Sequence, residues 1–235
     1  MRRGEEEGFL KVAISIDDDE MVERLCRMFV RHGASEKCPD IVRDAVRDGY
    51  KRLLRPSIEA ESAQAAKEKA DAAAISVFAD NVQQLLMAPP LGRKRVMAID
   101  PGFKNGCKVA CIDEQGALMA TDVVYPCAPV NDMYGAADVL CTMVGRLGID
   151  VIAVGDGTAS RETMSFLRDV TFPRNVTTVL VSESGASIYS ASETARREFP
   201  DLDITLRGAV SIGRRLLDPL AELVKIDPKS IGVGQ

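Results

Sequence analysis

The sequence has little of what many nucleic-acid-binding proteins depend on. It contains no tryptophan, aromatic residues make up 5% of the chain, and the net charge is -5. The chain therefore has few aromatic side chains on which single-stranded bases could stack. It also lacks the net positive charge typical of nucleic-acid binders. Any such binding must come from a local patch or from regions outside these residues.

Zinc ligands and membrane-spanning segments are also scarce. The six cysteines include no Cys-x-x-Cys pair and His32 is the single histidine, so we expect no zinc site. No apolar run approaches the ~20 residues that cross a bilayer, and residues 1–8 are charged, unlike a secretory signal. We therefore expect an intracellular protein with reduced thiols and no membrane partner.

Helical periodicity dominates residues 1–92. An exception is the stretch from Leu10 to Ile16, where alternating apolar residues predict a half-buried strand. The three aspartates at 17–19 indicate a helix N-cap rather than a metal site.

Helices are expected at 21–29, 41–54 and 57–87, with a loop at 33–39, a break or kink at Pro56 and a stop at Pro89 and Pro90. The third would be a spine helix of roughly 45 Å at ~1.5 Å per residue, with small residues that let another helix approach. A basic hinge is expected at 91–95.

After this hinge the pattern becomes a mixture of strands and helices. We expect strands at 96–100, 107–113, 117–125, 151–154 and 177–181, the last two of them buried. A helix to 147 would be capped by Asn131 or Asp132 and ended by Gly148, and further helices are expected from about 160, at 186–199 and at 206–226 with an interruption at Pro219. Hairpins would join the first three strands, and right-handed crossovers would make the last two parallel. The predicted fold class is α/β, a ribonuclease H-like mixed sheet of three antiparallel and then two parallel strands, preceded by a mostly helical segment.

Three of the expected strands end on an acid. Asp100 ends the first, Asp156 follows the fourth after one glycine, and Glu183 follows the fifth. If these strands are adjacent and parallel, the carboxylates converge at one edge of the sheet, where they could hold Mg²⁺ for phosphodiester cleavage. Asp100, Asp156 and Glu183 are therefore the candidate catalytic and metal-binding residues. A purely structural Asp-Pro-Gly turn is the alternative for Asp100.

Other residues near this edge each allow a functional and a structural interpretation. Glu162 is a possible fourth acid, but an acid in the first turn of a helix also suits the helix dipole. The loop at 156–158 could instead cradle a phosphate at a helix N-terminus, as in actin-like ATPases. Lys104 and Arg161 are candidate contacts to a phosphate backbone, with ordinary solvated surface as the alternative.

Several longer segments resemble the bacterial transcription accessory protein Tex family. They are RVMAIDPGFKNGCK at 95–108, GDGTASRET at 155–163, VSESGASIYSASETA at 181–195 and the final thirty residues from LRGAVSIGRRLLDP onward, with RGEEEGFLKV and YKRLLRPSIE in the first part. The resemblance covers essentially the whole chain. It implies a helical segment with a spine helix at 1–92, a YqgF-type ribonuclease H-like domain at 93–222, and the start of a linker at 223–235. Helix-hairpin-helix elements and an OB-fold RNA-binding domain would follow in the family, so we expect an internal fragment of a larger protein.

The resemblance also bears on activity. Related resolvases place a glutamate after the fourth strand and an aspartate in the last helix, whereas this chain has Asp156 and then Gly208, Ser211 and Gly213, with no acid in that helix before Asp218. An incomplete site would bind Mg²⁺ only weakly, and no cofactor is expected to be required. The resemblance thus implies a nucleic-acid-associated scaffold without efficient nuclease activity. Its partners would be RNA or DNA, mainly through domains outside this chain, and the transcription machinery. The alternative is a Mg²⁺-dependent, resolvase-type nuclease that uses the carboxylate cluster.

Overall fold

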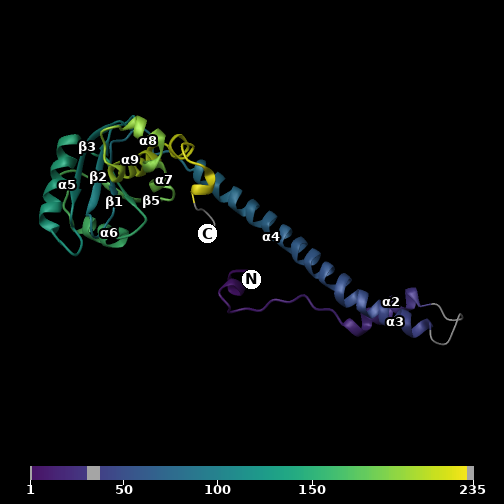
Figure 1. Ribbon diagram of the computed structural model, residues 1–235. Coiled ribbons are helices and arrows are strands. Elements are labelled where there is room, and N and C mark those ends of the chain that lie inside the picture. Colours follow the sequence, from purple (N-terminus) through teal and green to yellow (C-terminus); the bar gives the residue numbers. More distant parts are fainter. Residues whose placement is uncertain (1, 31–37, 232–235) are drawn as a thin grey trace. The chain divides into compact units, whose positions relative to one another are not determined.

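The computed structural model describes residues 2–30 and 38–231 (Figure 1). The chain divides into two units, residues 1–76 and residues 77–235, which we describe separately. His32, most of the loop expected at 33–39 and the last four residues lie outside the described residues. Within the part described, no helix combines the length and the apolar character needed to cross a membrane.

The first unit is helical. It contains α1 (Arg2–Glu6), α2 (Asp18–Phe29), α3 (Cys38–Gly49), a π-helical stretch (Tyr50–Leu54) and most of α4 (Arg55–Leu86). The Asp17 side chain accepts hydrogen bonds from the backbone amides of Asp19 and Glu20, at 3.0 and 3.1 Å, which confirms the predicted N-cap. Asp18 accepts a hydrogen bond from the Tyr50 hydroxyl at 2.8 Å and so fastens α2 to the π-helical stretch.

The strand predicted from Leu10 to Ile16 was wrong. These residues have no regular secondary structure, and the side chains of Leu10 and Ile16 are 52% and 60% exposed. An isolated strand cannot satisfy its backbone hydrogen bonds, and none of the described residues in this unit forms a neighbouring strand. Alternation of apolar residues is therefore not enough to predict a strand, because a strand also needs a partner.

Pro56 does not break the chain into two separate helices. Proline has no amide hydrogen, so the carbonyl of Arg52 loses its usual helical donor. The π-helical stretch before α4 absorbs this loss, since the Arg55 amide donates to the carbonyl of Tyr50, five residues earlier. The small residues expected to receive another helix, Ala66, Ala70 and Ala73, are exposed along α4.

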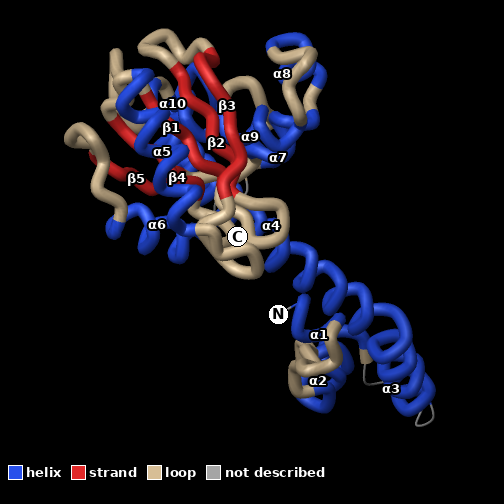
Figure 2. The backbone as a smooth tube through the Cα atoms, turned by 90° about the vertical axis from the view of Figure 1, so that its left-hand side faces the viewer, coloured by secondary structure: helices blue, strands red, loops and turns tan. Residues whose placement is uncertain are grey.

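The second unit is built on a five-stranded sheet (Figure 2). Its strands are β1 (Val96–Asp100), β2 (Cys107–Ile112), β3 (Leu118–Val124), β4 (Val151–Gly155) and β5 (Thr177–Val181), in the order β3-β2-β1-β4-β5. The pairs β1–β2 and β2–β3 are antiparallel, whereas β1–β4 and β4–β5 are parallel. The predicted fold class, an α/β ribonuclease H-like mixed sheet preceded by a helical segment, is confirmed.

Helices cover both faces of this sheet. The helices are α5 (Met133–Leu147), α6 (Ser160–Asp169), α7 (Ala186–Ala191), α8 (Glu193–Glu198), α9 (Ile204–Leu217), α10 (Pro219–Leu223) and a short 3₁₀ turn (Pro228–Ser230). Met97 and Ile99 of β1 belong to the same core cluster as residues of α5 and α6, whereas Val96 and Ala98 pack with residues of α9. Because side chains alternate along a strand, Asp100 lies on the α9 face.

Local signals at the ends of α5 predicted its boundaries well. The Asp132 side chain accepts a hydrogen bond from the Gly135 amide at 2.9 Å, and Gly148 ends the helix with a φ of 66°. That left-handed conformation costs glycine nothing, which is why glycine is common at this position. The helix expected at 186–199 is instead two short helices, because the backbone of Ser192 is extended and its side chain caps α8.

β5 was expected to be buried and the basic hinge at 91–95 to be unattached, and the structure differs on both. β5 is an edge strand, so it is only partly buried, and Leu180 is 52% exposed. The basic hinge is fastened to α9, since the Leu91 amide donates to the carbonyl of Leu216 at 3.0 Å. Beyond α10, Ile226 and Ile231 are buried with Tyr189 and Leu223 in a third core cluster.

Candidate functional site

Asp100 ends the central strand of the sheet and faces α9. Helix α9 approaches it closely at Gly208, where an added Cβ would lie 3.3 Å from the Asp100 Oδ2 atom. Burial raises the pKa of Asp100 to about 6, and the negative charge of Glu183 adds to this rise, while the positive charge of Lys108 opposes it. Asp100 is therefore a carboxyl group that changes its protonation state near neutral pH.

Glu183 approaches the same place from the loop after β5. Its carboxylate lies against two glycines: an added Cβ would overlap Oε1 at Gly157 and would lie 2.6 Å from Oε2 at Gly155. Burial raises the pKa of Glu183, and the charge of Asp156 adds to the rise, while a backbone hydrogen bond from Gly157 and the charge of Arg215 oppose it. The glycines after β4 thus make room for a carboxylate from the neighbouring loop.

Asp156 has a different task from the other two acids. Its side chain is exposed, and Oδ1 accepts a hydrogen bond from the Glu183 backbone amide at 3.0 Å. Its own amide donates to the carbonyl of Val181, also at 3.0 Å. Asp156 therefore ties the loop after β4 to the loop after β5 and so positions Glu183.

The structure brings two of the three predicted acids into one cavity. Asp100 and Glu183 both line a cavity of about 320 Å³ between the sheet edge and helices α7 and α9, and Gly208 and Ile212 complete the α9 wall. Asp156 does not line it. We name this feature the Asp100–Glu183 cavity.

The donor set of this cavity does not fit a metal centre. Within residues 2–30 and 38–231, no group of three histidine, cysteine, aspartate or glutamate side chains is placed to hold a metal ion. Asp100 and Glu183 are two carboxyls whose pKa values are raised, so each favours its neutral form more than an ordinary acid does. Mg²⁺ needs ionised oxygen ligands in near-octahedral geometry. The metal-binding and catalytic roles expected for Asp100, Asp156 and Glu183 stay predictions without support from this geometry.

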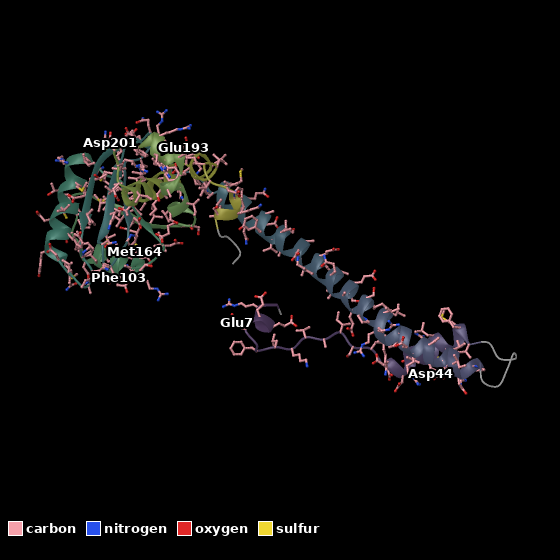
Figure 3. The ribbon with its side chains drawn as sticks, viewed as in Figure 1. Glu7, Asp44, Phe103, Met164, Glu193 and Asp201 are labelled. Carbon is pink, nitrogen blue, oxygen red and sulfur yellow. The ribbon has the colours of Figure 1, made fainter. Side chains whose placement is uncertain are left out.

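The predicted phosphate contacts, Lys104 and Arg161, are exposed near the carboxyl ends of the adjacent parallel strands β1 and β4. Lys104 follows β1, and Arg161 is in the first turn of α6 after β4. Phe103, beside Lys104, is 38% exposed (Figure 3). Among the ion pairs of the described residues, none involves Lys104 or Arg161, and Glu162 is likewise exposed. Both cations are therefore free to face a ligand, which is compatible with the predicted role but does not test it.

A phosphate cradle at the loop before α6 is not supported. The helix begins after Ala159, whose φ is 65°, and no side chain caps it. However, the Glu183 carboxylate already fills the space beside Gly157. A phosphate in that place would meet a carboxylate, and two negative groups in contact repel each other.

Sequence reasoning missed Arg215 and Glu222, which are both buried. The Arg215 Nη1 atom donates hydrogen bonds to the carbonyls of Ser182 and Ser184, at 2.9 and 2.7 Å. Arg215 thus holds the backbone on both sides of Glu183. A signal was present in the sequence, because Arg215 lies four residues after Ser211, on the buried face of a helix with clear 3.6-residue periodicity.

Comparison with known proteins identifies the family to which these features belong. A family model described as the Tex protein YqgF-like domain matches residues 94–217, which include the whole sheet and α9. This chain belongs to the Tex family. The resemblance seen in the sequence is therefore confirmed.

Named Tex relatives extend this match over most of the chain. Protein tex of Bordetella pertussis is 54% identical over 77% of this chain and 23% of its own length. The transcriptional accessory protein Tex of Neisseria gonorrhoeae is 45% identical over 99% of this chain and 31% of its own length. The human S1 RNA-binding domain-containing protein 1 is 37% identical over the full chain and 24% of its own length. The chain thus spans a third or less of each of these relatives.

Comparison with solved structures also returns a match of low similarity. RuvC of T. thermophilus, solved in complex with a Holliday junction substrate, is 13% identical, covers 56% of this chain and 96% of its own, and has a TM-score of 0.41.

Proposed function

We propose that this Tex-family chain is a scaffold module that associates with nucleic acid and has no efficient nuclease activity. The observation that carries the proposal is the Asp100–Glu183 pair. It lacks a third carboxylate, and Gly208 stands beside Asp100 on the helix that approaches it. Two carboxylates supply few of the oxygen ligands that the near-octahedral geometry of Mg²⁺ demands.

The names of the relatives support the nucleic-acid and transcription parts of this proposal. One is called a transcriptional accessory protein and another contains an S1 RNA-binding domain. We infer that the whole protein acts inside the cell with RNA or DNA and with the transcription machinery. We further infer that much of its affinity resides in regions that this chain does not cover, because its net charge is -5.

The second candidate function is a Mg²⁺-dependent, resolvase-type nuclease. One observation favours it: Asp100 and Glu183 meet at the carboxyl edge of the parallel strands, where sheets of this type place their sites. The two proposals differ in one measurable outcome, which is metal-dependent cleavage that depends on Asp100.

The deciding experiment incubates the protein with branched and single-stranded DNA and RNA in Mg²⁺ or Mn²⁺, alongside the Asp100→Asn variant. We expect no cleavage by either protein above the level of a metal-only control. Cleavage by the native protein that disappears in Asp100→Asn would overturn the scaffold proposal and establish the nuclease. Cleavage that persists in the variant would indicate a contaminating enzyme, which a second purification removes.

A further inference from the structure

The exposed aromatic side chains of the second unit lie at one edge of the sheet. Among the described residues from 77 to 231, the aromatic side chains exposed to solvent are those of Phe103 and Tyr134, at 38% and 93%. Phe103 follows β1, and Tyr134 lies in the first turn of α5 after β3. Both strands run in the same direction, because each is antiparallel to β2, which lies between them. The two rings therefore belong to the edge at which β4 also ends.

Contacts between loops make this edge one surface. The loop after β1 packs on the loop after β3, since a Cβ added at Gly106 would lie 2.7 Å from the Tyr125 ring. The chain then turns back into α5, because the Asp132 amide donates to the carbonyl of Tyr125 at 2.8 Å. On the other side, the Cys107 Sγ atom lies 3.6 Å from the Thr163 Oγ1 atom, which joins the start of β2 to the first turn of α6. The loops after β1, β3 and β4 are thus in contact with one another.

The packing of the unit does not use the Tyr134 ring. A ring that is 93% exposed adds almost nothing to a core, so its aromatic face is available to a partner. Tyr134 and Arg161 belong to α5 and α6, which cover one face of the sheet, whereas Asp100 and Glu183 line their cavity with α7 and α9 on the other face. The acid pair is therefore set apart from these two side chains.

Two cations accompany the rings, and two of the nearby acids already have partners. Within the described part of the chain, neither Lys104 nor Arg161 forms an ion pair. The Asp132 and Asp156 carboxylates each accept a hydrogen bond from a backbone amide, at 2.9 and 3.0 Å, which offsets part of their charge. Glu162 is exposed next to Arg161 and opposes an anion. The surface thus suits a ligand that joins flat aromatic groups to spaced negative charges, held weakly.

We propose that this surface, which we name the aromatic edge, binds single-stranded nucleic acid, with bases stacked on Phe103 and Tyr134 and phosphates on Lys104 and Arg161. The inference rests on the proposed function and names the nucleic acid that this part of the chain takes. Stacking on a side chain needs bases that are not enclosed in a duplex, and it tolerates any sequence because every base has a flat face. Three strand spacings separate β3 from β4, roughly 14 Å at ~4.8 Å each, a span that about four nucleotides of a stacked strand cover.

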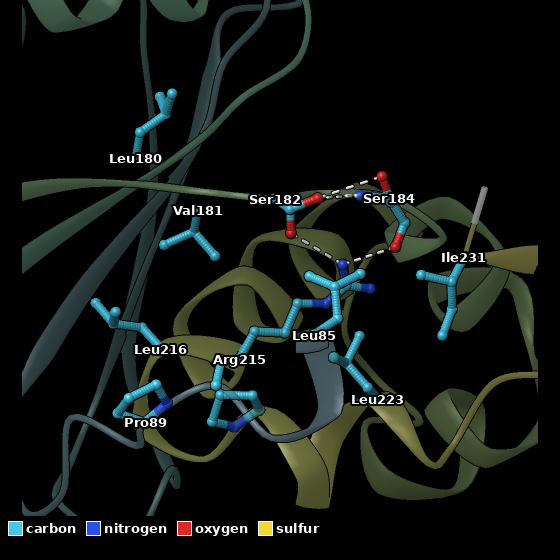
Figure 4. A pocket seen from close by; sticks show the side chains of 12 residues that line it. Leu85, Pro89, Leu180, Val181, Ser182, Ser184, Arg215, Leu216, Leu223 and Ile231 are labelled. Carbon is cyan, nitrogen blue, oxygen red and sulfur yellow. Dashed lines mark hydrogen bonds between the residues drawn. The ribbon is translucent and has the colours of Figure 1, made fainter. Parts of the chain in front are cut away.

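Two cavities of the same unit offer a base no comparable face. One, of about 180 Å³, lies beside Arg215, whose Nη1 atom donates to the carbonyls of Ser182 and Ser184 (Figure 4). Its lining contains aliphatic, proline, serine and arginine side chains and no aromatic ring. The Asp100–Glu183 cavity also lacks a ring, and its carboxylates repel phosphate. We therefore expect the bases on the open edge.

The first test uses the absence of tryptophan from this chain. Tyr134→Trp introduces a fluorescent reporter and keeps a ring that stacks, so oligothymidylate at low salt should quench its emission. An abasic strand of equal length and charge should bind about five-fold more weakly or worse, because it has no bases to stack. Phe9→Trp is the matched control, since Phe9 is an exposed ring of the first unit, and its emission should not change. No quenching in Tyr134→Trp, equal quenching in both variants, or equal affinity for the two strands would overturn the proposal.

The second test removes the ring or a charge. Tyr134→Leu keeps an apolar side chain at an exposed position, so it should fold, and it should weaken binding of oligothymidylate and oligouridylate about five-fold or more. Its affinity for the abasic strand should be unchanged. Glu162→Gln removes an opposing charge and should tighten binding of all three strands several-fold. Unchanged binding of the two oligonucleotides to Tyr134→Leu would refute the proposal and leave the ring as a surface for a protein partner.

This proposal and the scaffold proposal fail on different measurements. The scaffold proposal fails if Asp100-dependent cleavage is found, whereas the aromatic edge fails if binding at Tyr134 does not depend on bases. A chain that bound no oligonucleotide at low salt would overturn the aromatic edge alone, because we place much of the affinity of the whole protein in other regions.

Discussion

The carboxylate of Glu183 occupies the space that a side chain on Gly157 would need. Gly157 follows β4 and Glu183 follows β5, so their contact joins the carboxyl ends of two adjacent parallel strands. The glycine is thus explained by the approach of a neighbouring acid, and this approach brings Glu183 near Asp100.

The first prediction concerns the coupling between the two acids. Replacing Glu183 by glutamine removes the negative charge that helps to raise the pKa of Asp100. We expect the Asp100 pKa to fall below 6 but to stay above 3.8, because burial is the larger cause of the rise. Titration of the ¹³C carboxyl signal of Asp100 by NMR measures this. An unchanged pKa would show that the two carboxylates do not interact.

The second prediction concerns stability and pH. The folded-state pKa of Asp100 is about 6, above its ordinary value of 3.8, so the native state binds a proton more tightly than the unfolded state does. The contribution of this group to stability is complete below about pH 4 and is lost as the pH rises through 6. We expect Asp100→Asn to be more stable than the native protein at pH 8 by about 1 to 3 kcal/mol, with the difference vanishing near pH 4.

Urea unfolding at a series of pH values measures this difference. Asp201→Asn is a matched control, because Asp201 is an exposed aspartate outside the Asp100–Glu183 cavity (Figure 3). If Asp100→Asn were least stable relative to the native protein at high pH, the carboxylate would be stabilising and our account of its burial would be wrong.

The third prediction concerns Glu198, which joins several helices of the second unit. It accepts hydrogen bonds from the Tyr189 hydroxyl at 3.0 Å and from Arg214 Nη1 at 2.5 Å, and it pairs with Lys225 at 3.0 Å. Burial opposes its charge, but these three partners outweigh burial and lower its pKa. We expect Glu198→Gln to lower the free energy of unfolding by about 1 to 3 kcal/mol at pH 7. The loss should shrink as the pH falls and the native carboxyl becomes protonated.

Glu193→Gln provides the comparison for this variant. Glu193 pairs with Arg197 one turn along α8, and both side chains are largely exposed. Exposed pairs of this kind contribute about 0.3 to 0.5 kcal/mol. Equal losses in the two variants would show that the Glu198 network adds nothing beyond a surface ion pair.

The fourth prediction uses two glycines with similar positive φ angles. Gly106, before β2, has a φ of 72°, and an added Cβ would lie 2.7 Å from the Tyr125 ring and 2.9 Å from the Val124 carbonyl oxygen. Gly92 has a φ of 78° and no atom within 4 Å of the added Cβ. Alanine at either position costs about 1 to 2 kcal/mol for the left-handed backbone. Denaturation should show a further loss of about 1 to 2 kcal/mol for Gly106→Ala, and similar losses for both variants would contradict the close packing at Gly106.

The fifth prediction tests the proposed phosphate contacts. Binding of this acidic chain to nucleic acid should be weak and should disappear with modest salt, because release of counterions drives it. Lys104→Gln and Arg161→Gln should each reduce the slope of log affinity against log salt by about 1. Arg197→Gln is the control, since Arg197 already pairs with Glu193. Equal slopes for all three variants would place the contacts elsewhere.

Local signals in the sequence predicted much of the second unit. The bounds of β1 and β5 matched, and Asp132 and Gly148 marked the ends of α5, because caps and strand periodicity act over a few residues. The errors concern neighbours far apart in sequence. Nothing in Leu10–Ile16 reveals that a partner strand is missing, and nothing in Thr177–Val181 reveals that β5 lies at an edge.

The candidate site shows the same limit. The order of the strands was enough to bring Asp100 and Glu183 together. Asp100 ends β1 and Glu183 follows β5, and the parallel strand β4 lies between these two strands. Spacing could not show that the Asp156 side chain binds the Glu183 amide, because that depends on the shapes of two loops. Arg215 was missed because arginine is usually exposed, and its burial follows from its position on the inner face of α9.

The central place of β1 in the sheet also has a consequence for the order in which the protein folds. Val96 pairs with Ile112 on one side, a short distance along the chain, and with Val151 on the other, after α5 has crossed over. Closing the longer loop costs more chain entropy, so we expect the pairing of β1 with β4 to follow that with β2. The approach of Glu183 to Asp100 requires β5 as well and therefore comes later still. The repulsion between these two carboxylates thus arises only after β1 has paired with β2 and β4.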